Sequence, residues 1–262
     1  MSTDELLPYN GQATPQEIYA YQQRIGSITF AAVSTRPDIA KSCSKLAEFM
    51  QNPSPEHMNT ANRVLSYLLR TKTLAVKYTS RSIQQTFLCA ADAAFADHLQ
   101  DRHSSQGYIF MLYGGPIDWK ASKQHTVTTS STEAELLALS YAAKEMLWWN
   151  RLFNAIQFNT DQNLSIYSDN QQTIRLLVKD APQLTTKLRH VDIHQHWLRQ
   201  EVQQGRIHVH WLPTNEMLAD GLTKTLPRQR HEAFIRQLHL QDIQDKLVQT
   251  HLSWGGVSAP LR

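Results

Sequence analysis

The sequence predicts an α/β fold: a mixed five-stranded sheet with helices on both faces, preceded by a small helical unit. Two observations support this prediction. Apolar residues recur at helical spacing over residues 17–69, whereas short apolar runs and alternating patterns typical of strands dominate after about residue 82. The later elements follow the order strand, strand, strand, helix, strand, helix, helix, strand, helix. That order indicates a three-stranded meander followed by crossover strands.

The composition is that of a globular protein. Hydrophobic residues (AVILMFWYC) make up 41% of the 262 residues, which is enough to bury a sizeable core. No run approaches the ~18 apolar residues that span a bilayer, and the N-terminal segment lacks the basic and apolar regions of a secretory signal. We therefore expect no membrane partner. Cys43 and Cys89 form neither a disulfide framework nor a CxxC zinc pattern, which favours a reducing compartment.

The change of period at about Arg81-Ser82 is taken as a domain boundary. With the proline and glycine breakers, it divides the chain into a polar lead-in at residues 1–18, a helical unit at 19–82, an α/β domain at 83–226 and a C-terminal tail at 227–262. Within the helical unit, residues 39–50 and 57–69 have the apolar spacing of amphipathic helices. We predict that the α/β domain folds without the helical unit.

Turn and cap signals delimit the elements of the α/β domain. Gly114-Gly115 marks a hairpin between the second and third strands, and Ser131 or Thr132 is a natural N-cap for the long helix. Strands are expected at residues 86–92, 106–113, 116–120 continued by 125–128, 164–168 and 206–212. Helices are expected from residue 131 onward and at residues 170–178, 190–204 and 216–225.

Four acidic residues stand where predicted strands end or helices begin. Asp92 ends the first strand, and Glu135 lies in the first turn of the long helix. Asp169 follows the fourth strand, and Asp220 lies on the last helix. Groups at such places in an α/β sheet can converge on one site. Each residue alone is explained as a loop residue or a helix cap, but four in this order favour a shared site.

Converging carboxylates indicate a metal site. Clustered carboxylates repel one another and are unfavourable without cations. Mg²⁺ prefers oxygen ligands and bridges to phosphate. Two such ions about 3.5–4 Å apart stabilise the attacking and leaving oxygens of an in-line phosphoryl transfer. The four residues therefore predict a site for two Mg²⁺ or Mn²⁺ ions.

Six motifs in register carry a resemblance to a known family over about residues 9–226. They are Thr35-Arg36-Pro37-Asp38-Ile39-Ala40 with Arg63 to Leu68, Ala91-Asp92-Ala93, Ser105 to Phe110, Ser130-Ser131-Thr132-Glu133-Ala134-Glu135, His190-Val191-Asp192 and Ala219-Asp220-Gly221-Leu222-Thr223-Lys224. With these motifs the chain resembles the C-terminal part of the polymerase polyprotein of Copia-type LTR retrotransposons. That part comprises the reverse-transcriptase connection and the RNase H domain.

The resemblance implies a fold, a reaction and partners. Residues 83–226 would have the RNase H-like fold, and residues 19–82 would be a remnant of the reverse-transcriptase thumb or connection. The domain would hydrolyse the RNA strand of RNA–DNA hybrids with two Mg²⁺ or Mn²⁺ ions. The upstream polymerase part of the same polyprotein is a further implied partner. The Asp-Glu-Asp-Asp quartet that is both catalytic and metal-binding would be Asp92, Glu135, Asp169 and Asp220.

Two further acidic residues compete with the quartet as metal ligands, and the chain departs from the family pattern in two respects. Glu133 is expected to interact with the helix N-terminus rather than with metal, and Asp97 lies beyond the strand end. No Tyr/Phe-x-Asp-Asp motif occurs, so no polymerase activity is expected from this chain alone. The short loop before Asp220 has no histidine, although many cellular RNases H place one there. The alternative is an inactive retrotransposon-derived fragment that only binds nucleic acid or a protein partner, against which the intact quartet argues.

Contacts with nucleic acid are indicated only weakly. The net charge of +3 predicts no large basic surface. Side chains that could touch phosphates are Lys120, Lys123, Ser130 and Thr132.

For one pair of histidines and one pair of tryptophans, we favour a structural role over a functional one. His190 and His194 have a zinc-like spacing, but no cysteine or further carboxylate completes a set, so satisfied polar or surface histidines are favoured. Trp148-Trp149 could stack on bases, but their helical spacing favours the core.

Overall fold

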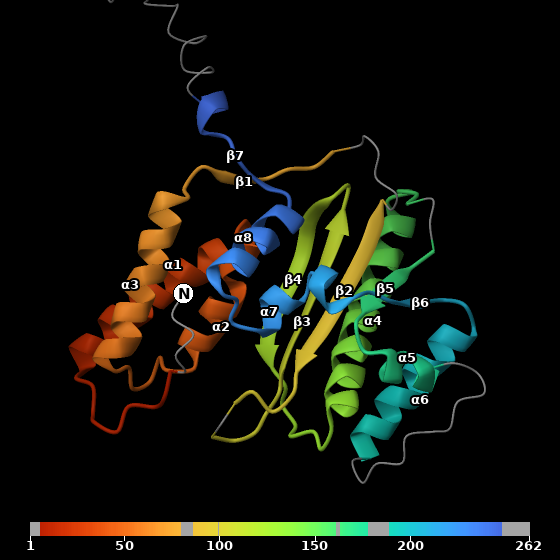
Figure 1. Ribbon diagram of the computed structural model, residues 1–262, viewed down its shortest axis with the longest axis horizontal. Coiled ribbons are helices and arrows are strands. Elements are labelled where there is room, and N and C mark those ends of the chain that lie inside the picture. The colour runs from red at the N-terminus through yellow and green to blue at the C-terminus, as the bar shows by residue number, and fades with distance from the viewer. Residues whose placement is uncertain (1–5, 80–85, 99, 161–162, 178–188, 248–262) are drawn as a thin grey trace, which may run out of the picture.

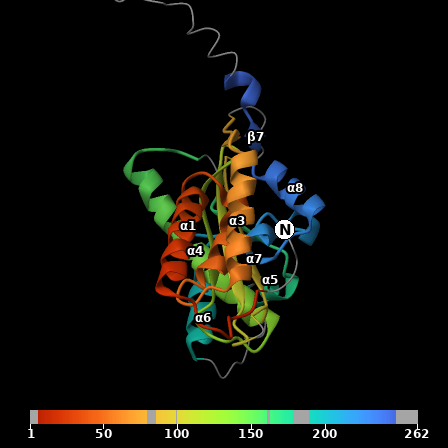
Figure 2. The same ribbon diagram turned by 90° about the vertical axis from the view of Figure 1, so that its left-hand side faces the viewer.

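The computed structural model describes residues 6–79, 86–98, 100–160, 163–177 and 189–247. A central sheet separates two groups of helices (Figure 1). Figure 2 shows α1 and α3 of the N-terminal group together on one side of the molecule. Within the described residues, no helix combines the length and the hydropathy that a membrane-spanning segment needs.

Three helices form the N-terminal unit: α1 (Pro15–Ser34), α2 (Ala40–Ala47) and α3 (Pro55–Arg70), with a 3₁₀ turn at Pro37–Ile39. The hydroxyls of Thr14 and Ser54 cap α1 and α3 by accepting hydrogen bonds from backbone amides three residues later. The apolar faces meet in a shared core that includes Tyr21, Ile28 and Val64. The helical unit predicted from the apolar spacing is therefore present.

The five-stranded sheet has the order β4-β3-β2-β5-β6. Its strands are β2 (Phe87–Ala94), β3 (Ser105–Leu112), β4 (Gly115–Lys123), β5 (Ser165–Ser168) and β6 (His208–Trp211). Strands β2, β3 and β4 form an antiparallel meander, whereas β5 and β6 add in parallel to β2. The prediction of a mixed five-stranded sheet is confirmed. Residues 125–128, expected to continue the third strand, lie outside β4, which ends at Lys123.

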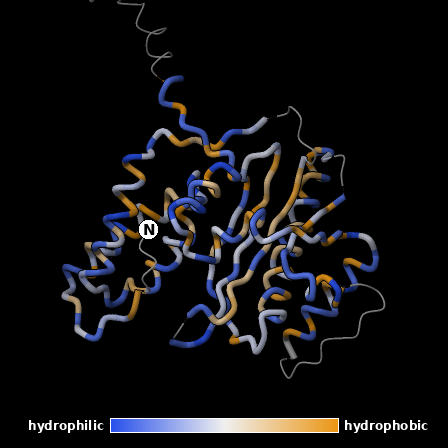
Figure 3. The backbone as a smooth tube through the Cα atoms, in the orientation of Figure 1, coloured by the Kyte–Doolittle hydropathy of each residue, from blue (hydrophilic) through white to orange (hydrophobic). Residues whose placement is uncertain are grey.

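Helices cover both faces of this sheet. On one face lie α4 (Ser131–Ala155), α5 (Gln171–Leu177) and α6 (Arg189–Gln203). Residues between Phe87 and Ile207 form the core on this side, and apolar residues are frequent along the strands and α4 (Figure 3). On the other face lie α7 (Asp220–Thr223) and α8 (Arg228–Gln237). This confirms the predicted mixed sheet with helices on both faces. The helix expected at 216–225 is shorter, because a 3₁₀ turn at Thr214–Glu216 precedes α7.

Residues 228–242 form a helix and a strand, where the sequence analysis expected a tail. Helix α8 buries Phe234 against the core beneath α7, and Leu238 follows it there. Strand β7 (Leu240–Asp242) then pairs antiparallel with β1 (Leu74–Val76), a strand that the sequence analysis did not predict. The sequence signal for α8 is weak because most of its residues are polar, so that only Phe234 of the helix is buried.

The helical unit and the sheet are joined by specific contacts. The indole nitrogen of Trp119 in β4 donates to the carbonyl of Ala32 at 2.7 Å. Lys41 of α2 donates to Ser105 at 2.5 Å and forms an ion pair with Asp97 at 3.4 Å. Independent folding of the α/β domain remains a prediction. Helix α8 packs on the core of this domain, whereas β7 pairs with β1 of the helical unit.

We predict that a chain of residues 82–247 is more stable than a chain of residues 82–226. The longer chain keeps Phe234 and Leu238, which are 2% and 0% exposed, over the sheet. Burial of two such side chains contributes about 3 to 6 kcal/mol to the free energy of unfolding. Urea unfolding of both chains, followed by circular dichroism, measures the difference. Equal stability of the two chains would show that the contact with α8 contributes nothing.

Candidate active site

Three of the four predicted carboxylates come together at one edge of the sheet. Asp92 lies near the end of β2, Glu135 one turn into α4 and Asp169 directly after β5. Each residue offers one carboxylate oxygen, and the three oxygens lie within 4.8 Å of one another. Asp92 and Glu135 are buried, and Asp169 is half-buried. Among the described residues, this is the group that the spacing of acidic, histidine and cysteine side chains marks as able to hold a metal ion.

The local structure explains why these residues meet. Strands β2 and β5 are parallel neighbours, with Cys89 opposite Ile166 and Ala90 opposite Tyr167, so their carboxyl ends reach the same edge. The hydroxyl of Ser130 caps α4 at this edge by accepting from the amide of Glu133 at 3.2 Å. The cap is thus one residue before Ser131 and two before Thr132, the two expected positions. Glu135 is thereby held one turn into the helix, facing the strand ends.

The hydrogen bonds of the cluster leave one buried oxygen free for a ligand. The Thr223 hydroxyl donates a short hydrogen bond to Asp92 Oδ2, and the Thr214 hydroxyl donates to Asp169 Oδ2 at 2.7 Å. In contrast, Glu135 Oε2 is buried and has no hydrogen-bond partner among the described residues. A buried carboxylate oxygen without a partner is costly. A hard divalent cation such as Mg²⁺ prefers oxygen ligands. The three carboxylates, among which Glu135 carries the unpartnered oxygen, fit such a cation.

Burial and mutual repulsion raise the pKa of the buried carboxyls. Burial raises the pKa of Glu135 well above its ordinary value, and the charges of Asp92 and Asp169 raise it further. The pKa of Asp92 is also raised, chiefly by burial, although Lys224 and the Thr223 hydroxyl oppose the shift. Removing water from like charges is unfavourable without a cation. The electrostatics therefore favour a cation at this site.

The fourth predicted carboxylate, Asp220, is near Asp92 but lies outside the group of three. Lys224 donates to Asp220 Oδ1 at 2.5 Å, and Arg230 donates to Asp220 Oδ2 at 3.2 Å. Lys224 also forms an ion pair with Asp92 Oδ2 at 3.4 Å. Burial lowers the pKa of Lys224, but the charges of Asp92 and Asp220 outweigh burial and raise it. In this structure Asp220 is thus engaged by two basic side chains.

Two glycines allow α7 to reach the cluster. Gly107 of β3 lies opposite Asp92 in the sheet, and a Cβ there would stand 2.7 Å from the Cβ of Leu222. A Cβ on Gly221 would stand 2.4 Å from the ring of Phe234. Such separations are too short for ordinary contact. The absence of side chains at both positions therefore lets α7 place Thr223 beside Asp92.

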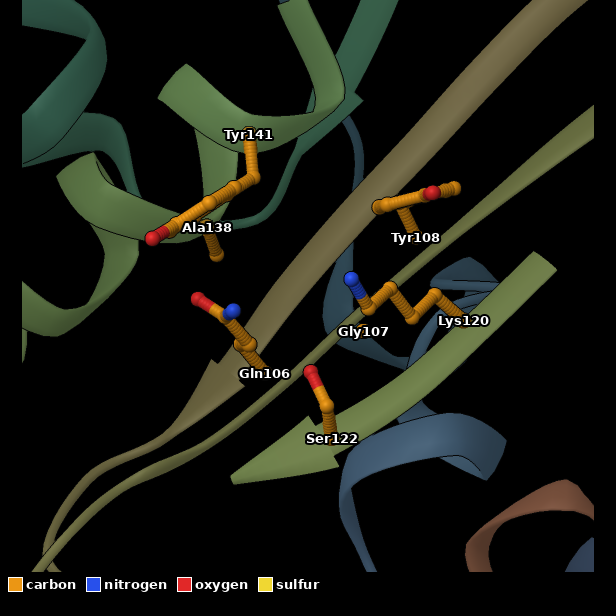
Figure 4. A pocket seen from close by; sticks show the side chains of 7 residues that line it. All are labelled: Gln106, Gly107, Tyr108, Lys120, Ser122, Ala138 and Tyr141. Atoms are coloured by element: carbon orange, nitrogen blue, oxygen red, sulfur yellow. The ribbon is translucent and has the colours of Figure 1, made fainter. Parts of the chain in front are cut away.

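The proposed nucleic-acid contacts occupy different environments. Lys120 extends from β4 towards a shallow pocket beside α4, which Gln106, Ser122 and Tyr141 also line (Figure 4). Lys123 forms an ion pair with Asp101. The Ser130 hydroxyl caps α4, and that of Thr132 lies 3.4 Å from Gln172 Oε1. Ser130 and Thr132 are close to the acidic cluster in the chain, whereas Lys120 and Lys123 lie on the edge strand.

The acidic residues and histidines considered as alternative metal ligands contact other groups in the structure. Glu133 accepts from the amide of Thr129 at 2.7 Å and so contacts the start of α4 rather than the cluster. Asp97 accepts from the amide of Ser105 at 2.7 Å. His194 lies 2.8 Å from the Ser140 hydroxyl, and the side chain of His190 lies outside the described residues.

The tryptophan pair divides between core and surface. Trp149 packs against the α4-side core and donates to Asp118 at 3.2 Å. Trp148 is half-exposed. The core interpretation therefore fits Trp149 and not Trp148.

Sequence reasoning missed the side chains that hold the carboxylates. Thr214, Thr223, Lys224 and Arg230 all contact Asp92, Asp169 or Asp220, and none was singled out as a site residue. Lys224 stands four residues after Asp220, a spacing at which opposite charges pair on a helix. That spacing could have identified Lys224. Arg230 lay in the expected tail, so nothing in the sequence placed it near the site.

The raised pKa values predict a pH dependence of stability without metal. A carboxyl whose pKa is raised on folding stabilises the protein below its unfolded pKa, and this stabilisation is lost as the pH rises through the folded value. Asp92 and Glu135 are both of this kind. In EDTA, the melting temperature of the parent should therefore fall more steeply than that of Glu135→Gln as the pH rises above the ordinary carboxyl range. Parallel curves for the two chains would contradict the assignment of the raised pKa to Glu135.

Sequence comparison finds Pol polyproteins of plant transposons. The retrovirus-related Pol polyprotein from transposon TNT 1-94 of Nicotiana tabacum is 34% identical over 213 residues, which cover 81% of this chain and 16% of that protein. The corresponding polyprotein from transposon RE1 of Arabidopsis thaliana is 32% identical over 83% of this chain and 15% of its own length. The chain thus spans about a sixth of the relatives that it matches.

Structural comparison finds RNase H proteins. LC11-RNase H1, isolated from compost, aligns with 53% of this chain and 94% of its own at 12% identity and a TM-score of 0.41. No protein-family model matches the chain. The sequence relatives of the chain are thus Copia-type Pol polyproteins from plant transposons, to which it is similar over most of its own length.

Proposed function

We propose that this chain is a metal-dependent ribonuclease H that cleaves the RNA strand of RNA–DNA hybrids. The observation that carries the proposal is the meeting of Asp92, Glu135 and Asp169, whose oxygens lie within 4.8 Å of one another. The unpartnered Glu135 Oε2 adds a buried acceptor that a cation would satisfy. The sequence relatives, which are Pol polyproteins, supply the biological setting.

Asp92, Glu135 and Asp169 would hold the divalent ions, Mg²⁺ or Mn²⁺. A bound ion at such a site polarises a phosphoryl oxygen and lowers the pKa of water. The chain's own hydroxyls fix the ligands: Thr223 orients Asp92, and Thr214 orients Asp169. Ligands that are already oriented lose little freedom when the ion and substrate bind.

We propose Asp220 as the fourth carboxylate of the site. Its charge contributes to the raised pKa of Asp92, so it lies within electrostatic reach of the cluster. Its two oxygens accept from Lys224 and Arg230. The positive charges of Lys224 and Arg230 would therefore oppose metal binding at Asp220 while both contacts persist.

The substrate would approach at the edge of the sheet where the cluster lies. Ser130 and Thr132, at the start of α4, stand closest in the chain to Glu135, and Lys120 and Lys123 would meet a strand passing β4. Specificity for the RNA strand requires a contact to its 2′-hydroxyls. The upstream polymerase part of the polyprotein is proposed as a protein partner that positions the hybrid.

A strand-labelled hybrid tests the proposed function. The full chain is incubated with the same hybrid labelled either on the RNA or on the DNA strand, in Mg²⁺, in Mn²⁺ and in EDTA. We expect cleavage of the RNA strand only, with either ion and not in EDTA. A correctly folded chain that binds the hybrid without cleaving it would overturn the proposal and support the alternative of an inactive fragment that only binds.

A further inference from the structure

We propose that Lys224 is a resident cation of the acidic site, whose ammonium competes with a divalent metal ion for Asp92. The proposal rests on the metal site of the proposed function and assigns a role to a side chain that was not among the predicted site residues. Lys224 would act as a positioning residue, because it acts on the metal ligands rather than on substrate.

The position of the ammonium is the first support. Lys224 Nζ lies 2.5 Å from Asp220 Oδ1 and 3.4 Å from Asp92 Oδ2, so that one ammonium contacts both carboxylates. The side chains of Asp92 and Asp220 are only 1% and 6% exposed, whereas that of Lys224 is 38% exposed. The ammonium thus reaches buried anions from a side chain that is open to solvent. It can withdraw without unfolding the site.

The anchoring of α7 is the second support. Thr223 is fully buried and donates to Asp92 Oδ2, and the amide of Lys224 donates to the Asp220 carbonyl at 2.9 Å. The backbone at Lys224 is therefore fixed beside the cluster while its long side chain remains free to change rotamer. The last residue of α7 thus provides a ligand-orienting hydroxyl, and the residue directly after the helix provides the competing cation.

Arg230 provides a reason why Lys224 can leave Asp92. Arg230 contacts the second oxygen of Asp220, at 3.2 Å from Oδ2. When Lys224 moves away, Asp220 keeps this cationic partner, whereas Asp92 loses its only ion-pair partner among the described residues. Asp92 would then be free for the ion that Glu135 and Asp169 also face.

The ammonium of Lys224 and a divalent ion would both stand beside the carboxylate of Asp92, and both are positively charged. A divalent ion bound to Asp92 would stand close to the ammonium, and their repulsion would lower metal affinity. Without metal, the same ammonium reduces the repulsion among the carboxylates. Lys224 should therefore stabilise the metal-free chain and weaken metal binding, two effects that are linked because metal stabilises only the state that binds it.

Titration with Mn²⁺ in a calorimeter measures the effect without substrate. We expect Lys224→Met to bind Mn²⁺ about tenfold more tightly than the parent, because one nearby, partly screened positive charge is removed. Lys224→Arg retains the charge and should remain close to the parent. Arg228→Gln is the matched control: it removes one positive charge from an exposed ion pair with Glu232 and should leave Mn²⁺ binding unchanged.

Thermal unfolding gives a second readout. In EDTA the melting temperature of Lys224→Met should be lower than that of the parent, and saturating Mn²⁺ should raise it by more than it raises the parent. Unchanged or weaker Mn²⁺ binding by folded Lys224→Met would overturn the role of Lys224. A parent that binds no Mn²⁺ would overturn this role together with the metal site. A parent that binds Mn²⁺ without cleaving hybrid would overturn the proposed function alone.

Discussion

Glu135→Gln should abolish cleavage of RNA–DNA hybrids while preserving the fold. The change keeps the shape of the side chain but removes one charge from the three-carboxylate group, including the oxygen that has no hydrogen-bond partner among the described residues. Loss of one ligand of a catalytic metal site costs several kcal/mol of transition-state stabilisation, or about 10³-fold or more in rate. Because Glu135 is buried near like charges, the metal-free variant should be at least as stable as the parent.

Glu133→Gln is the matched control for this prediction. Glu133 lies two residues earlier on the same helix and is also buried, but its carboxylate accepts from Thr129 at the start of α4. Its loss should cost about 1 kcal/mol of stability at most and leave most of the activity. Initial cleavage rates in Mg²⁺, with circular dichroism of both variants, provide the comparison. If Glu133→Gln is inactive and Glu135→Gln is active, the assignment of the ligand on α4 is wrong.

The largest loss of stability is expected from Asp38→Ala. The Asp38 carboxylate accepts from Arg36 at 2.9 and 2.8 Å and from the Tyr67 hydroxyl at 2.6 Å. Asp38 and Arg36 are only 4% and 5% exposed. Removing one partner leaves a buried guanidinium without its anion, which costs about 3 to 5 kcal/mol. The Asp38 carbonyl, which bonds to His231 of α8 at 3.0 Å, remains.

An exposed ion pair serves as the control for Asp38. Glu232→Ala removes the partner of Arg228, whose side chain is 90% exposed. Exposed pairs contribute little because solvent screens them, so this variant should unfold at nearly the same urea concentration as the parent. Urea denaturation followed by circular dichroism distinguishes the two changes. Similar midpoints for Asp38→Ala and Glu232→Ala would show that the buried network is not a major source of stability.

Much of the fold follows from local patterns in the sequence. The apolar runs at β2 and β3, the hairpin at Gly114-Gly115 and the cap of α4 each have a short-range signal, so their order predicts the mixed sheet. The pairing of β1 with β7 has no such signal, because it joins two three-residue segments far apart in the chain. Helix α8 was missed because it presents one buried residue, Phe234, among polar neighbours.

The candidate site could be predicted in part. Asp92, Glu135 and Asp169 stand at strand ends or at a helix start, and parallel pairing of β2 with β5 brings such positions together. The state of Asp220 could not be predicted, because it depends on Arg230 from α8. The role of Thr223 depends on the close approach of α7 to Gly107, a tertiary contact without a local pattern. Contacts between distant segments therefore account for most of what the sequence reasoning missed.

Anomalous diffraction from crystals of the full chain grown with Mn²⁺ tests the central claim most directly. The proposed metal-dependent nuclease requires Mn²⁺ bound to oxygens of Asp92, Glu135 and Asp169, and an anomalous peak should lie between these three residues. The same experiment on Glu135→Gln should give a weaker peak or none. Saturating Mn²⁺ that binds elsewhere, with the three carboxylates intact and the site open to solvent, would contradict the assignment of this cluster as the metal centre.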